Sequence, residues 1–128
     1  LHTLDINKEY TSVAERYFKR SSYSNNIKQH IGNALKIIPN FECNFQLAFI
    51  DADKENYSAY FDLLIDKIDI GGYIIADNVL WSGKVTNDKM DKETSALDKY
   101  NKKTLSDARV ENILLPVRDG LMISRKIK

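Results

Sequence analysis

Two short stretches hold side chains of the types needed to bind a divalent cation. Asp51 follows the apolar run FQLAFI, and Asp77 and Asn78 follow the apolar run GYIIA. If these runs are neighbouring parallel strands, their carboxyl ends meet at the sheet edge where ligands bind in open α/β folds. Two carboxylates and an amide offer the hard oxygen ligands that Mg²⁺ prefers and leave positions for water or substrate. The spacing therefore allows a metal site at this edge.

Lys54 adds a group that could move a proton. It lies three residues after Asp51, at the start of the next predicted helix, and could overhang the same pocket. A lysine pKa falls near a divalent cation, and a neutral amine can take a proton from a bound hydroxyl. The alternatives are ordinary, because an Asp at a strand end is often a cap or a solvated residue and a Lys is usually a surface charge. The convergence of the residues favours the functional interpretation.

A second group of polar residues could contact a nucleotide-like cofactor. Asp5 ends the first predicted strand, where nucleotide-binding α/β folds place an acid that accepts hydrogen bonds from ribose hydroxyls. Its alternative is helix capping, for which Asn7 is better placed. The segment 32–34 (Gly-Asn-Ala) could present an amide and backbone N–H groups to an adenine edge, or simply cap a short helix. Local pattern alone leaves both alternatives open.

The elements that must position these residues alternate between apolar runs and amphipathic helical stretches. This pattern predicts an α/β fold with a mostly parallel sheet, formed by one domain over residues 1–128. The last two strands are joined by the short turn RDG and must be antiparallel. The predicted strands are 1–6, 27–31, 45–50, 72–78, 110–117 and 120–127, and the predicted helices are 7–20, 33–38, 55–68 and 92–106.

Three details of this pattern are specific enough to check. The strand 45–50 is apolar on both faces, which predicts a position deep in the sheet with helices on either side. The loop 79–90 has a length more typical of binding than of connection. Two helices should each present an apolar face, and Gly71-Gly72 should end the second of them. These faces comprise Tyr10, Val13, Ala14, Tyr17 and Phe18 in the first helix, and Tyr57, Tyr60, Phe61, Leu64 and Ile68 in the other.

Composition excludes several classes of protein. A formal net charge of +1 in 128 residues gives no electrostatic case for binding nucleic acid or a membrane surface. No apolar stretch approaches the roughly 20 residues needed to span a bilayer, so we expect a cytoplasmic protein. Cys43 is the only cysteine, which excludes an internal disulfide. We assign no function to His2 and His30.

Six stretches of the chain resemble the cation-dependent O-methyltransferases, which include catechol and caffeoyl-CoA O-methyltransferases. The resemblance covers essentially the whole chain, and the pair IDADK and ADNVLWSG is specific. It implies a Rossmann-like class I methyltransferase sheet and the transfer of a methyl group from S-adenosylmethionine to one hydroxyl of a catechol-like small aromatic. The acceptor would be held by Mg²⁺ or another divalent cation such as Mn²⁺ or Ca²⁺, in a homodimer. The stretches are TLDINKEY, IGNALKIIP, FIDADKENY, GGYIIADNVLWSGKV, DKETSALDKYN and LLPVRDGLMISRK.

The resemblance also implies roles for individual residues. Lys54 corresponds to the catalytic base, and Trp81 would border the acceptor, although an aromatic packed under a loop is an equal alternative for Trp81. Ala52 would lie against the adenine face. The implied metal ligands are Asp51, Asp77 and Asn78, and the implied cofactor-binding residues are Asp5, Ile6, Asn33, Ala34, Asp51 and Ala52.

The sequence departs from the family pattern in two ways. Asn33 stands where the family usually has an Asp within GDA, and we expect weaker cofactor binding at most, because an amide oxygen still accepts hydrogen bonds. In addition, nothing matches the family's N-terminal helices, first strand and glycine-containing cofactor loop, and Leu1 already lies in a predicted strand. In the family's strand order, 3-2-1-4-5-7-6, the unmatched strand sits between the strands that end in Asp5 and Ile50.

The unmatched first strand and cofactor loop have three explanations. The favoured one is that the chain is a piece of a longer protein; alternatively, another chain fills the gap, or the second and fourth strands pair directly. We expect the 128 residues acting alone to transfer little or no methyl group. The alternative functions are methylation of a hydroxylated uridine in transfer RNA and a catalytically inactive binding module that uses the exposed sheet edge.

Overall fold

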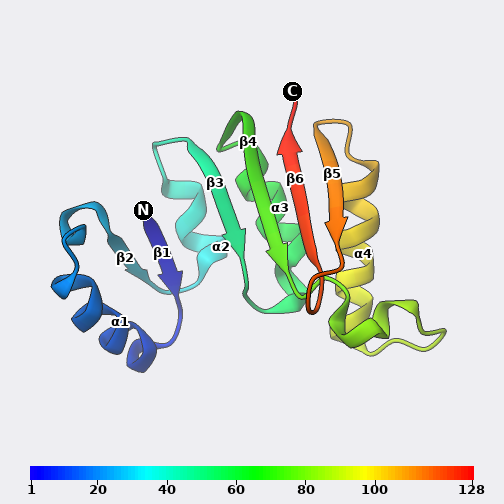
Figure 1. The fold of residues 1–128 in the computed structure, drawn as a ribbon, viewed down its shortest axis with the longest axis horizontal. Helices are drawn as coiled ribbons and strands as arrows, with labels where there is room; N and C mark the ends of the chain where they lie inside the picture. The colour runs from blue at the N-terminus through cyan, green and yellow to red at the C-terminus, as the bar shows by residue number, and fades with distance from the viewer. The chain divides into compact units, whose positions relative to one another are not determined.

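The computed structural model describes all 128 residues, which form two compact units, Leu1–Phe41 and Glu42–Lys128. The strands form two separate sheets, with orders β1-β2 and β3-β4-β6-β5 (Figure 1).

The first unit is a parallel strand pair with helices. Strands β1 (His2–Asp5) and β2 (Lys28–Ile31) pair in parallel, with Asp5 opposite Ile31. Helix α1 begins where predicted, because the Asn7 side chain accepts hydrogen bonds from two backbone N–H groups of its first turn. Helix α2 ends two residues before Pro39, and a 3-10 turn runs across that proline. The remaining elements are α1 (Lys8–Arg20), η1 (Ser24–Asn26), α2 (Ala34–Ile37) and η2 (Ile38–Asn40).

The apolar face predicted for α1 is largely uncovered. Tyr10, Val13 and Tyr17 are exposed, and Thr11 is the one buried residue of the helix. The backbone carbonyl of Thr11 accepts a hydrogen bond from Gln29 Nε2 on β2. The helix thus meets its own sheet through a narrow contact, and two short strands offer too little surface to bury the rest of the face.

The second unit is a four-stranded mixed sheet. Strands β3 (Phe45–Ile50) and β4 (Ile68–Asp77) are parallel, whereas β6 (Leu121–Lys126) pairs antiparallel with both β4 and β5 (Val110–Leu115). Strands β3, β4 and β5 thus run in one direction and only β6 runs in the other, which confirms the mostly parallel sheet with a C-terminal antiparallel hairpin. Helices α3 (Tyr57–Ile65) and α4 (Lys92–Ser106) lie on the same side of the sheet (Figure 1). The loop between β4 and α4 contains the irregular turn η4 (Trp81–Thr86).

The core of this unit lies between the sheet and the two helices. Side chains of β4 alternate in burial along the strand, and those that face the helices are fully buried. The predicted apolar face of residues 57–68 is confirmed as buried. Residues with no exposed surface include Tyr57, Phe61, Ile65, Ile74, Ala76, Leu97 and Tyr100. Two of these aromatic residues also approach Tyr100 edge-on, which ties α3 to α4.

The helix predicted over residues 55–68 is shorter than expected. A 3-10 turn, η3 (Lys54–Asn56), leads into α3, which ends at Ile65, and Ile68 already belongs to β4. Gly71-Gly72 therefore does not end a helix but lies within the strand, where the β3–β4 register shifts. A Cβ on Gly72 would lie 2.8 Å from the Gln46 backbone oxygen. The glycine pair allows an irregular, closely packed strand pair, which the sequence pattern did not distinguish from a helix end.

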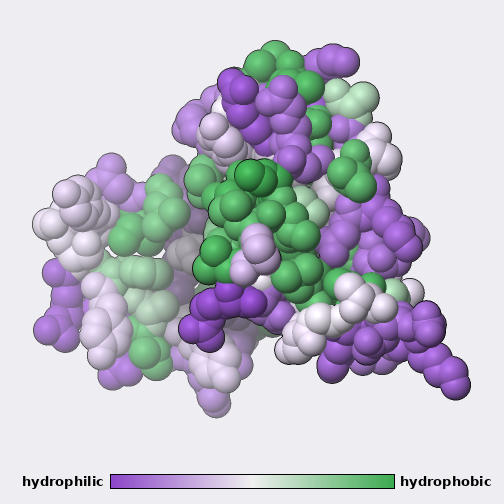
Figure 2. All heavy atoms as spheres, turned by 45° about the vertical axis from the view of Figure 1, so that its right-hand side comes forward, coloured by the Kyte–Doolittle hydropathy of each residue, from purple (hydrophilic) through white to green (hydrophobic).

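The sequence predicted that strand β3 lies deep in its sheet, but β3 is one of the two edge strands. Leu47 and Phe49 are more than half exposed, and only Ile50 of this strand is buried. The reason is that β3 pairs with β4 alone and both helices cover the opposite face. Figure 2 shows apolar side chains clustered at the surface, and the exposed apolar residues of this sheet include Leu47, Phe49, Tyr73 and Ile113. No helix of the chain is both long and apolar enough to cross a membrane.

Candidate active site

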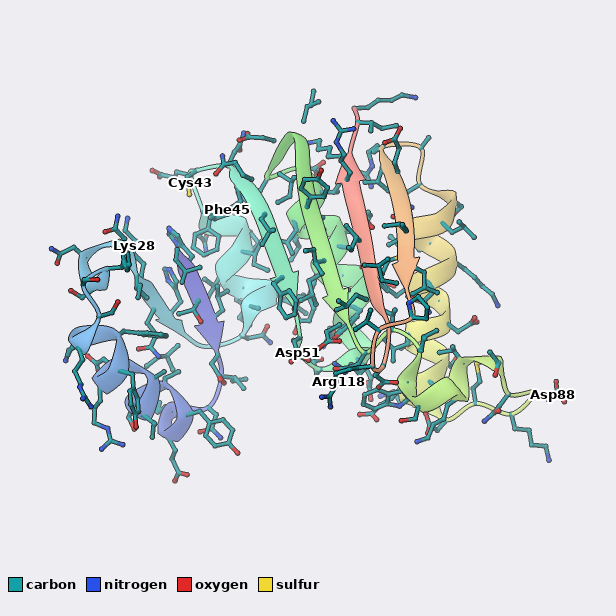
Figure 3. All side chains as sticks on the ribbon, in the orientation of Figure 1. Lys28, Cys43, Phe45, Asp51, Asp88 and Arg118 are labelled. Carbon is teal, nitrogen blue, oxygen red and sulfur yellow. The ribbon has the colours of Figure 1, made fainter.

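The carboxyl ends of β3 and β4 bring the predicted metal and base residues to one edge of the sheet. Ile50 and Ala76 are register partners in these parallel strands, so Asp51 and Asp77 follow at equivalent positions. Figure 3 shows Asp51 at the carboxyl end of β3, and Arg118 of the β5–β6 turn at the same end of this sheet. The sequence-based expectation that these strands are neighbours is confirmed.

Lys54 is the centre of the contacts at this edge. Its side chain is only 7% exposed although the adjacent Asp51 is 55% exposed. Its Nζ donates to Asp51 Oδ1 at 3.1 Å, to Asn78 Oδ1 at 3.0 Å and to the Tyr57 hydroxyl at 2.5 Å. An ammonium group has three donors, and here each one finds an acceptor. The surface-charge alternative for Lys54 is therefore wrong.

The end of β4 has a backbone conformation that aims Asn78 at this lysine. Asn78 has a φ of 60°, which non-glycine residues adopt rarely, although Asn tolerates it better than most. Asp77 Oδ1 accepts a hydrogen bond from the Asn78 backbone N–H at 2.7 Å, and the Asp77 carbonyl accepts one from the Tyr57 hydroxyl at 3.0 Å. Backbone strain of this kind is concentrated at functional sites.

The donor set fits a hard divalent cation. Asp51 Oδ1 and Asn78 Oδ1 both contact one positively charged atom, Lys54 Nζ, so two of the three predicted ligand oxygens already converge on a cation. The third predicted ligand, the Asp77 carboxylate, precedes Asn78 in the chain and accepts a hydrogen bond from the Asn78 backbone N–H. No group of three or more His, Cys, Asp or Glu side chains is placed to hold a metal, so a cation here needs the Asn78 amide as a ligand. Oxygen ligands of this type suit Mg²⁺ or Ca²⁺.

Tyr57 is a member of this cluster that the sequence analysis assigned only to the core. Its side chain is fully buried, with its ring centroid 4.7 Å from Lys54 Nζ. Burial and the nearby Asp51 carboxylate raise the pKa of the Tyr57 phenol well above its usual range, so the hydroxyl stays protonated. Its position three residues after Lys54 at the start of a helix was a usable signal, because such residues share a face.

Trp81 lies next to the same lysine. Lys54 Nζ is 5.5 Å from the centre of the indole ring, and Lys84 Nζ lies 6.0 Å from it. The indole Nε1 is buried and has no hydrogen-bond partner. A buried N–H normally has a hydrogen-bond partner, and this one has none within the chain. The indole N–H is therefore free to donate to a bound ligand. The predicted contact of Trp81 with the acceptor stays a prediction.

The loop that carries Trp81 is held by the β5–β6 turn. Val79 and Leu80 donate backbone hydrogen bonds to the carbonyls of Gly120 and Asp119, and the Asp119 carboxylate accepts one from the backbone of Ser82. Both Trp81 and Ser82 have positive φ. The sequence analysis treated the segment RDG only as a hairpin turn, and no local signal identified its second role, because its partners lie about forty residues earlier.

The predicted cofactor residues of the first unit are satisfied by local hydrogen bonds. Asp5 Oδ1 accepts from the Asn7 backbone N–H at 2.7 Å, and Asn33 Oδ1 accepts from that of Leu35 at 2.8 Å, which caps α2 ahead of Ala34. Ile6 is exposed. The Gly32 N–H donates to the Asp5 carbonyl at 2.9 Å, so these candidates share the carboxyl edge of the β1–β2 sheet. The capping alternative for Asn33 is confirmed, and the cofactor contacts stay predictions.

Ala52, in the second unit, is exposed directly after Asp51. It lies between the strand end and η3, in the segment that leads to Lys54. Its predicted contact with adenine stays a prediction.

The strand order, the paired parallel strand ends and the antiparallel hairpin define the Rossmann-like fold of the class I methyltransferases. Two solved structures illustrate the likeness, the SAH-bound Podospora anserina methyltransferase PaMTH1 and the Bacillus cereus O-methyltransferase in complex with SAH. Each is 26% identical with a TM-score of 0.88 and matches 99% of this chain. The match covers 60% of the Podospora chain and 62% of the Bacillus chain.

The sequence comparisons identify the family. Residues 1–127 match the O-methyltransferase family, and the chain belongs to it. A caffeoyl-CoA O-methyltransferase of Medicago sativa is 33% identical over an alignment 142 residues long, which covers 98% of this chain and 56% of that protein. The chain spans about half the length of the curated relatives it matches. The resemblance to the cation-dependent O-methyltransferases is thereby confirmed.

Proposed function

We propose that the protein is an S-adenosylmethionine-dependent O-methyltransferase that uses a divalent cation to methylate one hydroxyl of a catechol-like phenol. The observation that carries this proposal is the Lys54 ammonium, held between the Asp51 and Asn78 side-chain oxygens at the carboxyl end of a parallel strand pair. Two further findings support it. The Medicago relative is named for caffeoyl-CoA, whose caffeoyl group is a catechol, and two structural relatives bind SAH, the product that S-adenosylmethionine leaves after methyl transfer.

In this proposal the side chains of the second unit hold and deprotonate the acceptor. Asp51, Asp77 and Asn78 would hold the divalent cation, which would supply a Lewis acid that favours ionisation of an acceptor hydroxyl. Lys54 would act as the neutral amine and take the proton from that hydroxyl, and Trp81 would border the aromatic ring. The resulting oxygen nucleophile attacks the methyl carbon in line, so that a C–O bond forms as the C–S bond of the sulfonium breaks. No covalent bond to the protein is needed.

The cofactor half of the proposal rests on the first unit and on the segment after β3. Asp5 would accept hydrogen bonds from the ribose hydroxyls, and Asn33 and Ala34 would contact the adenine edge. Ala52 of the second unit keeps the role that the family resemblance gives it, a contact with adenine. In support, Asp5 and Asn33 lie near the carboxyl edge of a parallel strand pair, where α/β folds bind nucleotides. We further propose a homodimer in the cytoplasm that acts on small phenols without nucleic acid. Size-exclusion chromatography with light scattering measures the oligomeric state.

The direct test is methyl transfer from labelled S-adenosylmethionine to catechol and to caffeoyl-CoA by a purified protein that contains residues 1–128, since we expect these residues acting alone to transfer little or no methyl group. We expect product with Mg²⁺ and none after complete chelation. Lys54→Met should lower kcat by at least about 100-fold, because a positioned general base contributes about that much or more. The matched control is Lys102→Met, which removes an exposed lysine paired with Asp98 on α4 and should leave kcat unchanged. Full activity of the Lys54 variant, or activity that survives chelation, would contradict the proposal.

A further inference from the structure

The hydroxyl of Tyr57 is one of the three acceptors that surround Lys54, and it differs from the other two in kind. Asp51 and Asn78 are both candidate cation ligands, whereas Tyr57 is not. The three contacts have lengths of 3.1, 3.0 and 2.5 Å for Asp51, Asn78 and Tyr57, so the shortest is the one to the phenol. Any positive ion bound by Asp51 and Asn78 competes with the ammonium for the same oxygens. Tyr57 is then the acceptor that Lys54 retains.

Tyr57 is also fixed from several sides. Its side chain has no exposed surface, and its ring packs edge-on against Tyr100 of α4, with centroids 5.5 Å apart. Its hydroxyl donates to the backbone carbonyl of Asp77, which is the last residue of β4. One phenol therefore links the lysine at the start of α3 to the strand end that carries two of the candidate ligands. A hydroxyl has one donor and can accept, and both functions are used here.

We propose that Tyr57 is a positioning residue for Lys54: its buried hydroxyl holds the amine at the acceptor site and keeps the amine in register with the end of β4. The proposal deepens the function proposed above and rests on it, since Lys54 matters for methyl transfer only if it is the base. Tyr57 itself is not expected to touch the acceptor or the cofactor. Its effect should therefore pass entirely through Lys54.

The test compares Tyr57→Phe with Tyr60→Phe in the purified protein. Tyr60 is the matched control, because it is a nearly buried tyrosine of the same helix whose hydroxyl contacts Asp53 rather than Lys54. We expect Tyr57→Phe to lower kcat by about 10- to 100-fold, because a misplaced base loses part of its contribution. The KM for both substrates should stay within about threefold of the wild-type value. Tyr60→Phe should keep kcat within about twofold, a change too small to reflect loss of a positioned base. An equal loss in both variants, or none in Tyr57→Phe, overturns the proposal.

A double-mutant cycle tests whether Tyr57 acts through the lysine. In a Lys54→Met background, adding Tyr57→Phe should lower kcat by no more than about twofold, because residues that act as a unit are strongly non-additive. Additive losses overturn the proposal. If Tyr57→Phe alone fails to fold while the double variant folds, the buried ammonium has lost its anchor, as proposed. If neither folds, Tyr57 is structural and the proposal fails.

A readout without catalysis separates this proposal from the proposed function. Reductive methylation followed by peptide mass spectrometry measures how accessible each lysine is. We expect Lys54, which is 7% exposed, to be protected in the wild-type protein and in Tyr60→Phe, and to be labelled several-fold faster in Tyr57→Phe. Exposed Lys92 and Lys102 should be labelled equally in all three. Unchanged protection of Lys54 in Tyr57→Phe overturns the anchoring role even if the protein transfers no methyl group.

Discussion

The two units of this chain hold their candidate residues in different ways. In the second unit, Lys54 contacts Asp51 and Asn78 although these residues come from separate strand ends, and the lysine is nearly buried. In the first unit, Asp5 and Asn33 each hydrogen-bond a backbone N–H group two residues further along the chain. Contacts between distant segments thus form one site, and local caps account for the hydrogen bonds of the other candidates.

The difference matters because a local cap has a structural reason to exist without any ligand. An Asn at a helix N-cap contributes about 1 kcal/mol to stability, which explains Asn33 with no reference to a cofactor. A nearly buried ammonium has no such reason, since even a fully paired buried charge is often no more stable than apolar side chains of similar volume. The case for function is therefore stronger at the ends of β3 and β4 than at the ends of β1 and β2. Four predictions test this asymmetry.

The largest expected effect comes from Asp51→Ala. It should reduce kcat/KM by more than about 1,000-fold, because a bound cation stabilises the transition state by several kcal/mol. Calorimetric titration with Mn²⁺ should show cation binding in the wild-type protein and none in the variant. Asp69→Ala is the control, because Asp69 lies on β4 away from the site and contacts Gln46. Cation binding by Asp51→Ala with unchanged affinity would place the metal elsewhere.

The second prediction concerns the loop that carries Asn78 and Trp81. Gly120 has a φ of +85°, and a Cβ there would lie 2.5 Å from Leu80 Cγ, whereas Gly83 has a φ of +77° and open space around it. Gly120→Ala should lower the free energy of unfolding by about 3 kcal/mol through overpacking and backbone strain together. Gly83→Ala should cost about 1 kcal/mol through backbone strain alone. Urea denaturation measures both, and equal costs would show that the turn does not support the loop.

Much of the fold of the second unit could be predicted from the sequence, and each wrong prediction has a physical cause. The bounds of β3 and α4 were predicted correctly, because an apolar run and a capped amphipathic stretch are local signals. The helix predicted to continue to Ile68 was too long, because a buried Ile fits a helix face and a strand equally well. The environment predicted for β3 was wrong, because the burial of a strand depends on the elements next to it and not on its own residues alone. Asp51, Asp77 and Asn78 could be predicted to share an edge, because parallel strands align their ends.

The residues that the sequence did not reveal act across long separations. Asp119 and Gly120 support a loop about forty residues earlier, and Tyr57 donates to Asp77, twenty residues later. Each also has a sufficient local explanation, as a turn residue or as part of an apolar helix face. Sequence patterns report what a residue does for its own element and rarely what it does for another.

The third prediction tests the first unit directly. Asp5→Ala should weaken binding of S-adenosylmethionine by about 10- to 100-fold, because a hydrogen bond to a charged group contributes about 1.5 to 3 kcal/mol. The kcat at saturating cofactor and the affinity for Mn²⁺ should stay unchanged, in contrast to Asp51→Ala. Asp5→Asn, which retains an acceptor for the Asn7 N–H, should have an intermediate cofactor affinity. If Asp5→Ala binds the cofactor normally, the residue is only a turn acceptor.

The smallest expected effect separates capping from cofactor binding at Asn33. Asn33→Ala should lower the free energy of unfolding by about 1 kcal/mol, because the Leu35 N–H loses its partner, while Asn33→Asp keeps the cap and the stability. Cofactor affinity should follow a different order. The family usually has Asp at this position, so Asn33→Asp should bind S-adenosylmethionine a few-fold more tightly than the wild type, since hydrogen bonds that a carboxylate accepts are stronger than those of an amide. Calorimetry and thermal unfolding on the same samples measure both quantities. If affinity simply tracks stability across the three proteins, Asn33 acts only as a cap, and the contrast between the two units is one of function as well as of geometry.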